Sequence, residues 1–348
     1  MPGFPEIISF TITNRCNLRC KMCGQWGVEG YLKDDPNRFP DLPAGVWIRL
    51  ADEVAAHGRE WIGLRGGEPF LHPGILDILG HMKSKGLHVS MDTNGTVLKK
   101  FAGNIARLGI DNFNISVDGP ARIHDEVRGV KGTYAKLAEG VAAMDEACAR
   151  LGRPAPSRCI VFTISPWSYR GLAEMPDVAR ALKIPGIAIV PYYWFDRRTG
   201  ADYERVMKEE LGSAAWSWQG FHHETSGVDG SEFADQLRRF RENLREIQML
   251  PYMKYGEAEY REWFGNCTTK VGRYDCRMPW RLLDIQPHGD ANFCVDFPDY
   301  VIGNVADRTI EEVWNSPKAE KFRAFLRRQP LPICNRCGAK YMAGSEPE

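Results

Sequence analysis

The chain lacks the features that would direct it to a membrane or to a nucleic acid. Its 348 residues contain no run of about 18 apolar residues, so no membrane-spanning helix is predicted. Lysine plus arginine equals aspartate plus glutamate, at 45 each, so no excess charge points to nucleic acid or an anionic membrane. The first residues contain neither a basic stretch nor a long apolar one. No export signal is predicted, and we expect a cytoplasmic protein.

Ten cysteines stand out against this background. In a chain without an export signal, they favour metal ligands over disulfides. Cys16, Cys20 and Cys23 follow one another with gaps of three and two residues. Three thiolates on a four-iron cluster leave one iron without a protein ligand, and this iron is open to a small molecule. A zinc site is the alternative, but it needs a fourth ligand, and His57 and His72 lie far along the chain.

Short β-branched runs alternate with helical stretches over the first half of the chain. The pattern predicts strands at 6–13, 61–65, 88–92, 112–117, 158–164 and 186–192. It predicts helices between them, at 44–57, 74–85, 98–108, 134–151 and 169–182. Right-handed crossovers make such a sheet parallel. Because six strands are too few for a complete barrel, we predict an α/β fold with a partial (β/α)6 TIM-like barrel. Ligand groups should collect at the carboxyl ends of its strands.

The regular alternation stops near Phe195, which suggests three parts. We expect the barrel over 1–195, a connecting segment that can form a pocket wall over 196–265, and a small α+β module over 266–348. An amphipathic helix is predicted at 230–250. In the last part, a hairpin is expected at 282–295, with Cys294 on its second strand, followed by two short helices that begin near Thr309 and Ser316.

A second group of cysteines lies in the last part. Cys276, Cys294, Cys334 and Cys337 offer four thiolates, which can complete either a zinc site or a cluster without an open iron. Their spacing alone does not choose between the two.

The remaining cysteines have simpler explanations. Cys148 lies on the apolar face of a predicted helix and Cys159 lies within a predicted strand, so both are expected in the core. Cys267 is either an inert loop thiol or a hydrogen donor to a substrate radical.

The first cysteine motif resembles that of the radical S-adenosylmethionine (SAM) superfamily, with Met22 at the hydrophobic position before the third cysteine. The resemblance implies that the open iron binds the amino and carboxylate groups of SAM. An electron from the cluster then splits SAM into methionine and a 5′-deoxyadenosyl radical, which abstracts hydrogen from a substrate. A one-electron reductant such as flavodoxin or ferredoxin is also implied.

Polar motifs after the predicted strands extend this resemblance. Gly66-Gly67-Glu68-Pro69 follows the second strand, where two glycines let a ligand approach the backbone. The resemblance implies that this motif binds the amino group of SAM. It also assigns to SAM Asn94 after the third strand, and Ser116 and Asp118 after the fourth. Arg128 can form a bidentate pair with a carboxylate and is assigned to SAM as well, with a surface salt bridge as the alternative.

The second cysteine group, with Cys276-Arg277-Met278-Pro279-Trp280 and Cys334-x-x-Cys337, resembles the auxiliary-cluster region called SPASM, or its shorter form, twitch. Because the sequence ends soon after Cys337, the set resembles twitch, with one auxiliary cluster held by four cysteines. Two [4Fe–4S] clusters and SAM are therefore implied as cofactors. The cysteine arrangement resembles that of the 2-deoxy-scyllo-inosamine dehydrogenases, which oxidise an aminocyclitol alcohol. A purely structural auxiliary cluster is the alternative.

The residues that act on the substrate are the least defined. Asp196, His222 and His223 lie in an aromatic-rich segment and are candidate bases for a proton from an oxidised alcohol. Cys267 is the fourth catalytic candidate.

These features together predict an oxidoreductase of the radical SAM type. We expect a two-electron oxidation of a carbohydrate-like small molecule or a peptide, with the auxiliary cluster as electron acceptor. The alternatives are a redox-neutral epimerase or decarboxylase, a peptide maturase, and a non-catalytic iron–sulfur carrier or scaffold. The residues before Cys16 leave no room for a precursor-recognition domain, which favours a small molecule over a peptide. Neither a nucleic acid nor a membrane is expected as a partner.

Overall fold

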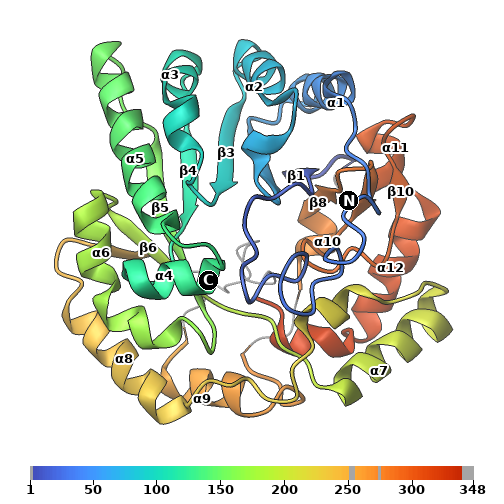
Figure 1. Cartoon of the computed structure of the whole chain (residues 1–348). Helices are drawn as coiled ribbons and strands as arrows, with labels where there is room; N and C mark the ends of the chain where they lie inside the picture. The colour runs from blue at the N-terminus through green and yellow to red at the C-terminus, as the bar shows by residue number, and fades with distance from the viewer. Residues whose placement is uncertain (1–2, 251–254, 273–275, 339–348) are drawn as a thin grey trace.

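A single sheet runs through the protein. The computed structural model describes residues 3–250, 255–272 and 276–338. Ten strands form the sheet in the order β10-β9-β8-β1-β2-β3-β4-β5-β6-β7. Pairing is parallel from β8 through β1 to β7 and antiparallel at the β8–β9–β10 end. Figure 1 shows the main helices on the outer side of this curved sheet.

The strands are β1 Ile7–Thr13, β2 Trp61–Gly66, β3 His88–Thr93, β4 Asn112–Ser116, β5 Ser157–Ile164, β6 Gly186–Pro191, β7 Gln248–Leu250, β8 Leu282–Ile285, β9 Asp290–Asn292 and β10 Gly303–Asn304. The α-helices are α1 Ala44–Ala56, α2 Ile75–Ser84, α3 Leu98–Leu108, α4 Ala121–Arg128, α5 Thr133–Arg150, α6 Met175–Leu182, α7 Arg197–Val206, α8 Gly230–Glu242, α9 Glu257–Gly265, α10 Met278–Arg281, α11 Ile310–Trp314 and α12 Pro317–Arg328.

The predicted fold class is confirmed, and the sheet is larger than expected. All six predicted strands form, as β1 to β6, and the partial barrel carries a C-terminal module. Two further parallel strands flank the six: β7 pairs with β6 and β8 pairs with β1. The connecting segment and the C-terminal module thus each contribute a strand to the barrel sheet.

One predicted helix is shorter than expected, and one observed helix was not predicted. The helix expected at 230–250 ends at Glu242. After it, Arg245 adopts a left-handed φ of 47°, and the chain turns into β7. Strand pairing with β6 therefore prevails over the helical pattern of this stretch. Helix α4 was not predicted, although Pro120 precedes it and Gly129 follows it with a φ of 72°, which are ordinary helix-boundary signals.

Alternation along the barrel strands separates an apolar outer face from a polar inner one. On β1, Ile8, Phe10 and Ile12 are buried in the main hydrophobic core. Thr11, between them, instead lines a cavity inside the barrel. Successive side chains of a strand point to opposite faces, so the inner face of this sheet is available for polar groups. Cys148 and Cys159 are both buried, as predicted, although Cys159 also lines the cavity.

The C-terminal module forms as the turn signals predicted. The β8–β9 hairpin is antiparallel, and Thr309 caps α11 through a capping box with Glu312. Ser316 caps α12, with Pro317 at its first position. Cys294 lies just beyond the end of β9 and not on the strand itself, which corrects the expectation.

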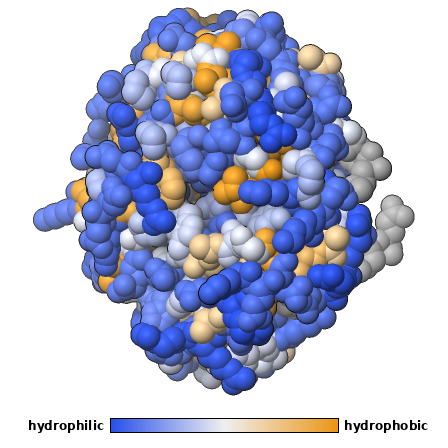
Figure 2. All heavy atoms as spheres, turned by 90° about the vertical axis from the view of Figure 1, so that its right-hand side faces the viewer, coloured by the Kyte–Doolittle hydropathy of each residue, from blue (hydrophilic) through white to orange (hydrophobic). Residues whose placement is uncertain are grey.

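One face of the molecule is mainly polar. Figure 2 views the molecule from the right-hand side of Figure 1, and apolar residues on that face occur as small, separate groups among hydrophilic ones. Among the described helices, none has the length and apolar character needed to cross a membrane.

Asp299 joins the segment after β6 to the C-terminal module. Its carboxylate, 4% exposed, accepts hydrogen bonds from the hydroxyl of Tyr203 at 2.8 Å and from the backbone N–H groups of Trp216 and Ser217 at 2.9 Å each. A buried carboxylate with this many donors holds both segments in place.

The substitution Asp299→Ala should therefore destabilise the fold. It leaves the Tyr203 hydroxyl and two backbone N–H groups buried without an acceptor, which should lower the free energy of unfolding by about 3 kcal/mol. Urea unfolding of the metal-free chain measures this. Asp307→Ala, at an exposed position, should change the free energy by less than about 0.5 kcal/mol. Equal effects of the two substitutions would contradict the role of Asp299.

Candidate functional site

A cavity of about 680 Å³ occupies the inner side of the barrel sheet. It is lined by the loop after β1, by inward side chains of β1 to β7, and by residues that follow β9. Cys16, Cys20 and Cys23 all line it, at the carboxyl end of the sheet where the sequence predicted ligand groups.

Short-range hydrogen bonds shape the cysteine loop. The backbone N–H of Cys23 donates to the carbonyl of Cys20 at 3.0 Å, and that of Gly27 donates to Cys23 at 2.8 Å. The indole N–H of Trp26 donates to the carbonyl of Asn14 at 2.8 Å and ties the turn to the end of β1. The loop therefore presents its three thiols from a closed turn.

The three thiols form one electrostatic group. Burial raises the pKa of Cys16 to about 12, with further raising by Cys20 and Cys23. Burial likewise raises the pKa of Cys23 to about 11, helped by Cys20. Thiols in such a setting become thiolates only when a cationic group such as iron offsets their charge. The set therefore fits a metal cluster.

The zinc alternative for the first cysteine group needs a fourth ligand. Neither His57 nor His72 lines the cavity that contains Cys16, Cys20 and Cys23.

The Gly-Gly-Glu-Pro motif packs tightly against the cysteine loop. Gly66 and Gly67 line the cavity. A Cβ on Gly66, whose φ is 154°, would lie 2.3 Å from the carbonyl oxygen of Thr13, and one on Gly67 would lie 2.3 Å from that of Arg15. Only glycine allows the exits of β1 and β2 to approach this closely.

Glu68 and Pro69 are buried and do not line the cavity. The Glu68 carboxylate accepts from the backbone N–H of Asn94 at 2.9 Å and from the Thr93 hydroxyl at 3.0 Å. Burial raises the pKa of Glu68 to about 7. Glu68 therefore positions Asn94, which lines the cavity. The contact between Glu68 and SAM stays a prediction.

Arg128 and Asp118 form a buried ion pair, with 2.6 Å between Nη2 and Oδ2 and side chains 8% and 0% exposed. The surface salt bridge considered from the sequence is therefore wrong. Arg128 and Ser116 line the cavity, whereas Asp118 lies behind Arg128. The guanidinium is 3.6 Å from the thiol of Cys20 and counteracts the rise that burial causes in the Cys20 pKa.

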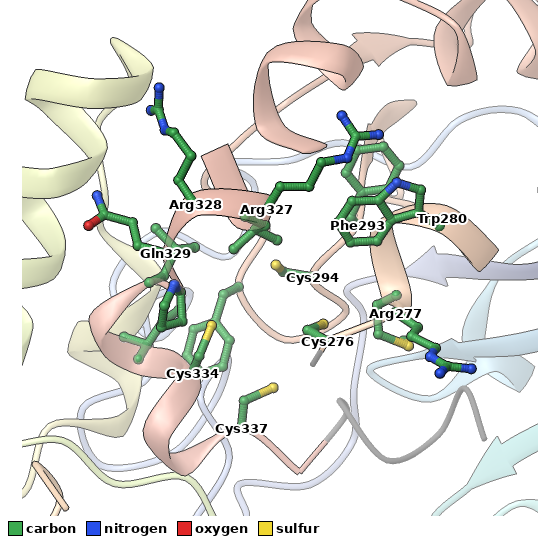
Figure 3. Close-up of a pocket in the computed structure, with 16 residues that line it drawn as sticks. Cys276, Arg277, Trp280, Phe293, Cys294, Arg327, Arg328, Gln329, Cys334 and Cys337 are labelled. Carbon is green, nitrogen blue, oxygen red and sulfur yellow. The ribbon is translucent and has the colours of Figure 1, made fainter. Parts of the chain in front are cut away.

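The four C-terminal cysteines line a second cavity, of about 520 Å³. Figure 3 shows the sulfur atoms of Cys276, Cys294, Cys334 and Cys337 around a common space. Burial raises the pKa of Cys294 well above its usual range, and the other three thiols raise it further. These four donors come from the residues just before α10, from the loop after β9 and from the short 3-10 helix Pro332–Arg336 with the residue after it, and they fit a second cluster.

The two cavities share a wall. Cys294 and Phe297 line the second cavity, while Val295 and Asp296, between them in the chain, line the first. Consecutive Cα atoms are about 3.8 Å apart, so one short segment separates the two spaces.

Several polar residues of the barrel interior were missed by the sequence analysis. Arg65 pairs with Asp296 at 2.9 Å, and the Tyr193 hydroxyl donates to Asp296 at 2.8 Å. The amide of Asn114 donates to Asp92 at 2.8 Å. All five line the first cavity. Polar residues at alternate positions of buried strands were the available signal.

The four candidate catalytic residues do not line either cavity. Asp196 caps α7 by accepting from the Thr199 N–H at 2.7 Å. The Cys267 thiol is 2% exposed and lies 3.4 Å from the Thr199 hydroxyl. His222 pairs with Glu224 at 2.9 Å, and the ring of His223 lies against Trp167 and Tyr192. Their catalytic roles stay predictions that this geometry does not support.

Comparison with known proteins defines the class to which this site belongs. Residues 10–150 match the model of the Radical SAM superfamily. These residues therefore carry a radical SAM domain, which implies SAM as a cofactor. Residues 276–338 match SPASM, an iron-sulfur cluster-binding domain. The chain thus combines a radical SAM domain with a SPASM domain, and the two domains together imply two iron–sulfur clusters.

Relatives of this class act in different pathways. The chain is 27% identical to pre-heme d1 synthase of Dinoroseobacter shibae, over 97% of this chain and 80% of that protein. It is 25% identical to the subtilosin biosynthesis protein AlbA of Bacillus subtilis, over 98% and 68%. The fold resembles that of Streptococcus suis SuiB bound to its precursor peptide SuiA, with a TM-score of 0.64, 17% identity and coverage of 97% and 72%.

The raised pKa of Glu68 predicts a pH-dependent stability. Its folded value, about 7, lies above its ordinary value of 4.5, so its contribution is fully present below pH 4.5 and is lost as the pH rises through 7. The stability of the metal-free wild type relative to Glu68→Gln should therefore fall by about 3 kcal/mol across this range.

Urea unfolding at a series of pH values measures the difference. Glu60→Gln, at an exposed site, controls for the general effect of losing a carboxylate. A difference between wild type and Glu68→Gln that is independent of pH would show that Glu68 is not a destabilised buried anion.

Proposed function

We propose that the protein catalyses a two-electron oxidation at a carbon–heteroatom centre, in a carbohydrate-like small molecule or a peptide. The observation that carries the proposal is the wall shared by the two cavities. A substrate in the first cavity lies next to Val295 and Asp296, and Cys294 at the start of this segment faces the second cavity. An electron leaving the substrate thus has a short path to the second cysteine group.

Each cysteine group has a distinct role in this proposal. Cys16, Cys20 and Cys23 hold the SAM-binding cluster, and Cys276, Cys294, Cys334 and Cys337 hold the auxiliary cluster. When bound, SAM and the first cluster supply the 5′-deoxyadenosyl radical that abstracts hydrogen, and the auxiliary cluster supplies the acceptor for the second electron. A one-electron reductant such as flavodoxin or ferredoxin provides the first electron.

The protein's own side chains orient SAM. The backbone of Gly66 and Gly67 is open to the cavity, and Asn94 and Ser116 offer polar groups at neighbouring strand ends. Arg128, held by Asp118, places a fixed positive charge beside Cys20, where it can receive a carboxylate.

The geometry favours oxidation over a redox-neutral reaction. In the epimerase alternative, Cys267 donates hydrogen to the substrate radical. Its thiol instead lies within hydrogen-bond distance of the Thr199 hydroxyl and does not line the cavity. For the substrate, the relatives AlbA and SuiB support a peptide, and the polar barrel interior is compatible with either class.

Removal of the auxiliary site should separate SAM cleavage from substrate oxidation. The double substitution Cys276→Ala/Cys334→Ala should lower the iron content by about four atoms per chain, because the second group loses half its ligands. The variant should still release 5′-deoxyadenosine from SAM, because Cys16, Cys20 and Cys23 are unchanged. Its yield of oxidised product per 5′-deoxyadenosine should fall at least about tenfold.

Anaerobic iron analysis and chromatography of the products measure these quantities. Cys148→Ala is the matched control, since this thiol is buried in the core and lines neither cavity. A double variant that loses the iron but keeps the wild-type product yield would show that the auxiliary cluster is structural.

A further inference from the structure

One row of inward side chains crosses the barrel sheet below the SAM-binding residues. Thr11 is the register partner of Arg65, Asp92 of Asn114, and Asn114 of Cys159. Arg65 follows Leu64, and Asp92 follows Met91. Because Leu64 and Met91 are register partners, Arg65 and Asp92 are also neighbours across β2 and β3. All five residues of the row line the first cavity.

Asp92 is the residue of this row that is available to a ligand. Its side chain is exposed, and because it lines the cavity inside the barrel, this exposure is to the cavity. One carboxylate oxygen accepts a hydrogen bond from Asn114 at 2.8 Å. No cationic side chain of the described residues lies within ion-pair distance of Asp92. The second oxygen is therefore open to the cavity.

The neighbouring carboxylates are already engaged. Asp296 uses one oxygen for Arg65 and the other for the Tyr193 hydroxyl. Asp284 is buried and accepts from the Thr11 hydroxyl at 3.3 Å and from Gln286. Arg65 pairs directly with Asp296 and acts on Asp92 from beyond ion-pair distance, where it counteracts the rise that burial causes in the Asp92 pKa.

The position of Asp92 points to the substrate and not to SAM. Asp92 on β3 precedes Asn94, just beyond the end of that strand, by two residues, and Asn114 precedes Ser116 by two on β4. Two residues of a strand span about 7 Å, so Asp92 and Asn114 lie one layer deeper than the proposed SAM contacts. A molecule that occupies the cavity below SAM meets this layer.

The charges of the layer define what it can bind. Asp92, Asp284 and Asp296 all act on Arg65 and raise its pKa against the effect of burial. Of these carboxylates, Asp92 and Asp296 line the cavity beside the single guanidinium of Arg65, so this part of the cavity carries more acidic than basic groups and would repel a carboxylate. A cationic donor would satisfy the open oxygen of Asp92.

We propose that Asp92, held in place by Asn114, binds a primary ammonium group of the substrate and so selects amine-bearing substrates. This inference rests on the proposed function, because it assumes that the cavity below SAM receives the substrate. The ammonium group can belong to an aminocyclitol-like small molecule or to a lysine side chain. Tyr193 and Phe221 supply aromatic wall for the carbon skeleton of either one.

Simple probes test the charge preference on the reconstituted enzyme with both clusters and SAM bound. Cyclohexylamine, cyclohexanol and cyclohexanecarboxylate differ mainly in one group. Saturation-transfer NMR titration should show the amine binding at least about tenfold more tightly than the carboxylate. Asp92→Asn should weaken amine binding about tenfold and change cyclohexanol binding less than about twofold. Asp307→Asn, at an exposed site, should change neither.

A second pair of probes distinguishes the two sources of the ammonium group. N-acetyl-lysine methylamide and its norleucine counterpart differ in the terminal ammonium. Tight binding of the lysine probe alone identifies a peptide substrate, and tight binding of cyclohexylamine alone identifies a small molecule. Either result supports the inference if the substitution Asp92→Asn abolishes the binding of that probe.

The inference would be overturned if the carboxylate probe bound as well as the amine, or if the Asp92→Asn variant kept the wild-type affinity for the amine. Loss of SAM binding in the Asp92→Asn variant would also overturn it, because Asp92 would then be a SAM contact. Iron content and circular dichroism establish that the variant is folded. Formation of 5′-deoxyadenosine by the wild type is measured in parallel. Its absence would defeat the proposed function, whereas its presence without amine selectivity would defeat only this inference.

Discussion

The parallel pairing of β1 with β8 is the contact on which the arrangement of the two sites depends. It joins Ile7 to Leu282 and Phe10 to Ile285, residues that lie at opposite ends of the chain. The hairpin that begins with β8 then returns through β9, after which Cys294 lines the second cavity and Val295 and Asp296 line the barrel interior. Without this pairing, the C-terminal cysteines would have no fixed relation to the first cavity.

A second constraint is the polar inner face of the barrel. Placing Arg65, Asp92, Asp284 and Asp296 inside the barrel costs free energy unless each finds partners or a ligand. The Arg65–Asp296 pair and the bonds from Thr11 and Gln286 to Asp284 offset much of that cost. Asp92 accepts a hydrogen bond from Asn114 and has no ion-pair partner among the described residues. The cavity beside it leaves room for a ligand to supply that partner. The outer face of the same strands is conventional apolar core.

The relatives share this framework while their names point to different substrates. Pre-heme d1 synthase and AlbA align with most of this chain at 27% and 25% identity, and SuiB has a similar fold. One fold can carry different reactions, so specificity depends on the side chains of the site and not on the framework. In this protein the row from Arg65 to Cys159 and the aromatic residues Tyr193 and Phe221 line the barrel interior.

Local patterns of the chain predicted the six barrel strands, the C-terminal hairpin, the cysteine groups and the motif glycines, because periodicity, turn chemistry and ligand spacing are local properties. The folded arrangement was needed to show that Asp196 caps a helix, that Cys267 lies away from the cavity, and that Arg128 is buried against Asp118. It was also needed to show that Asp92 faces the same space as Asp296. These relations depend on the register between strands far apart in the chain, which local patterns do not encode.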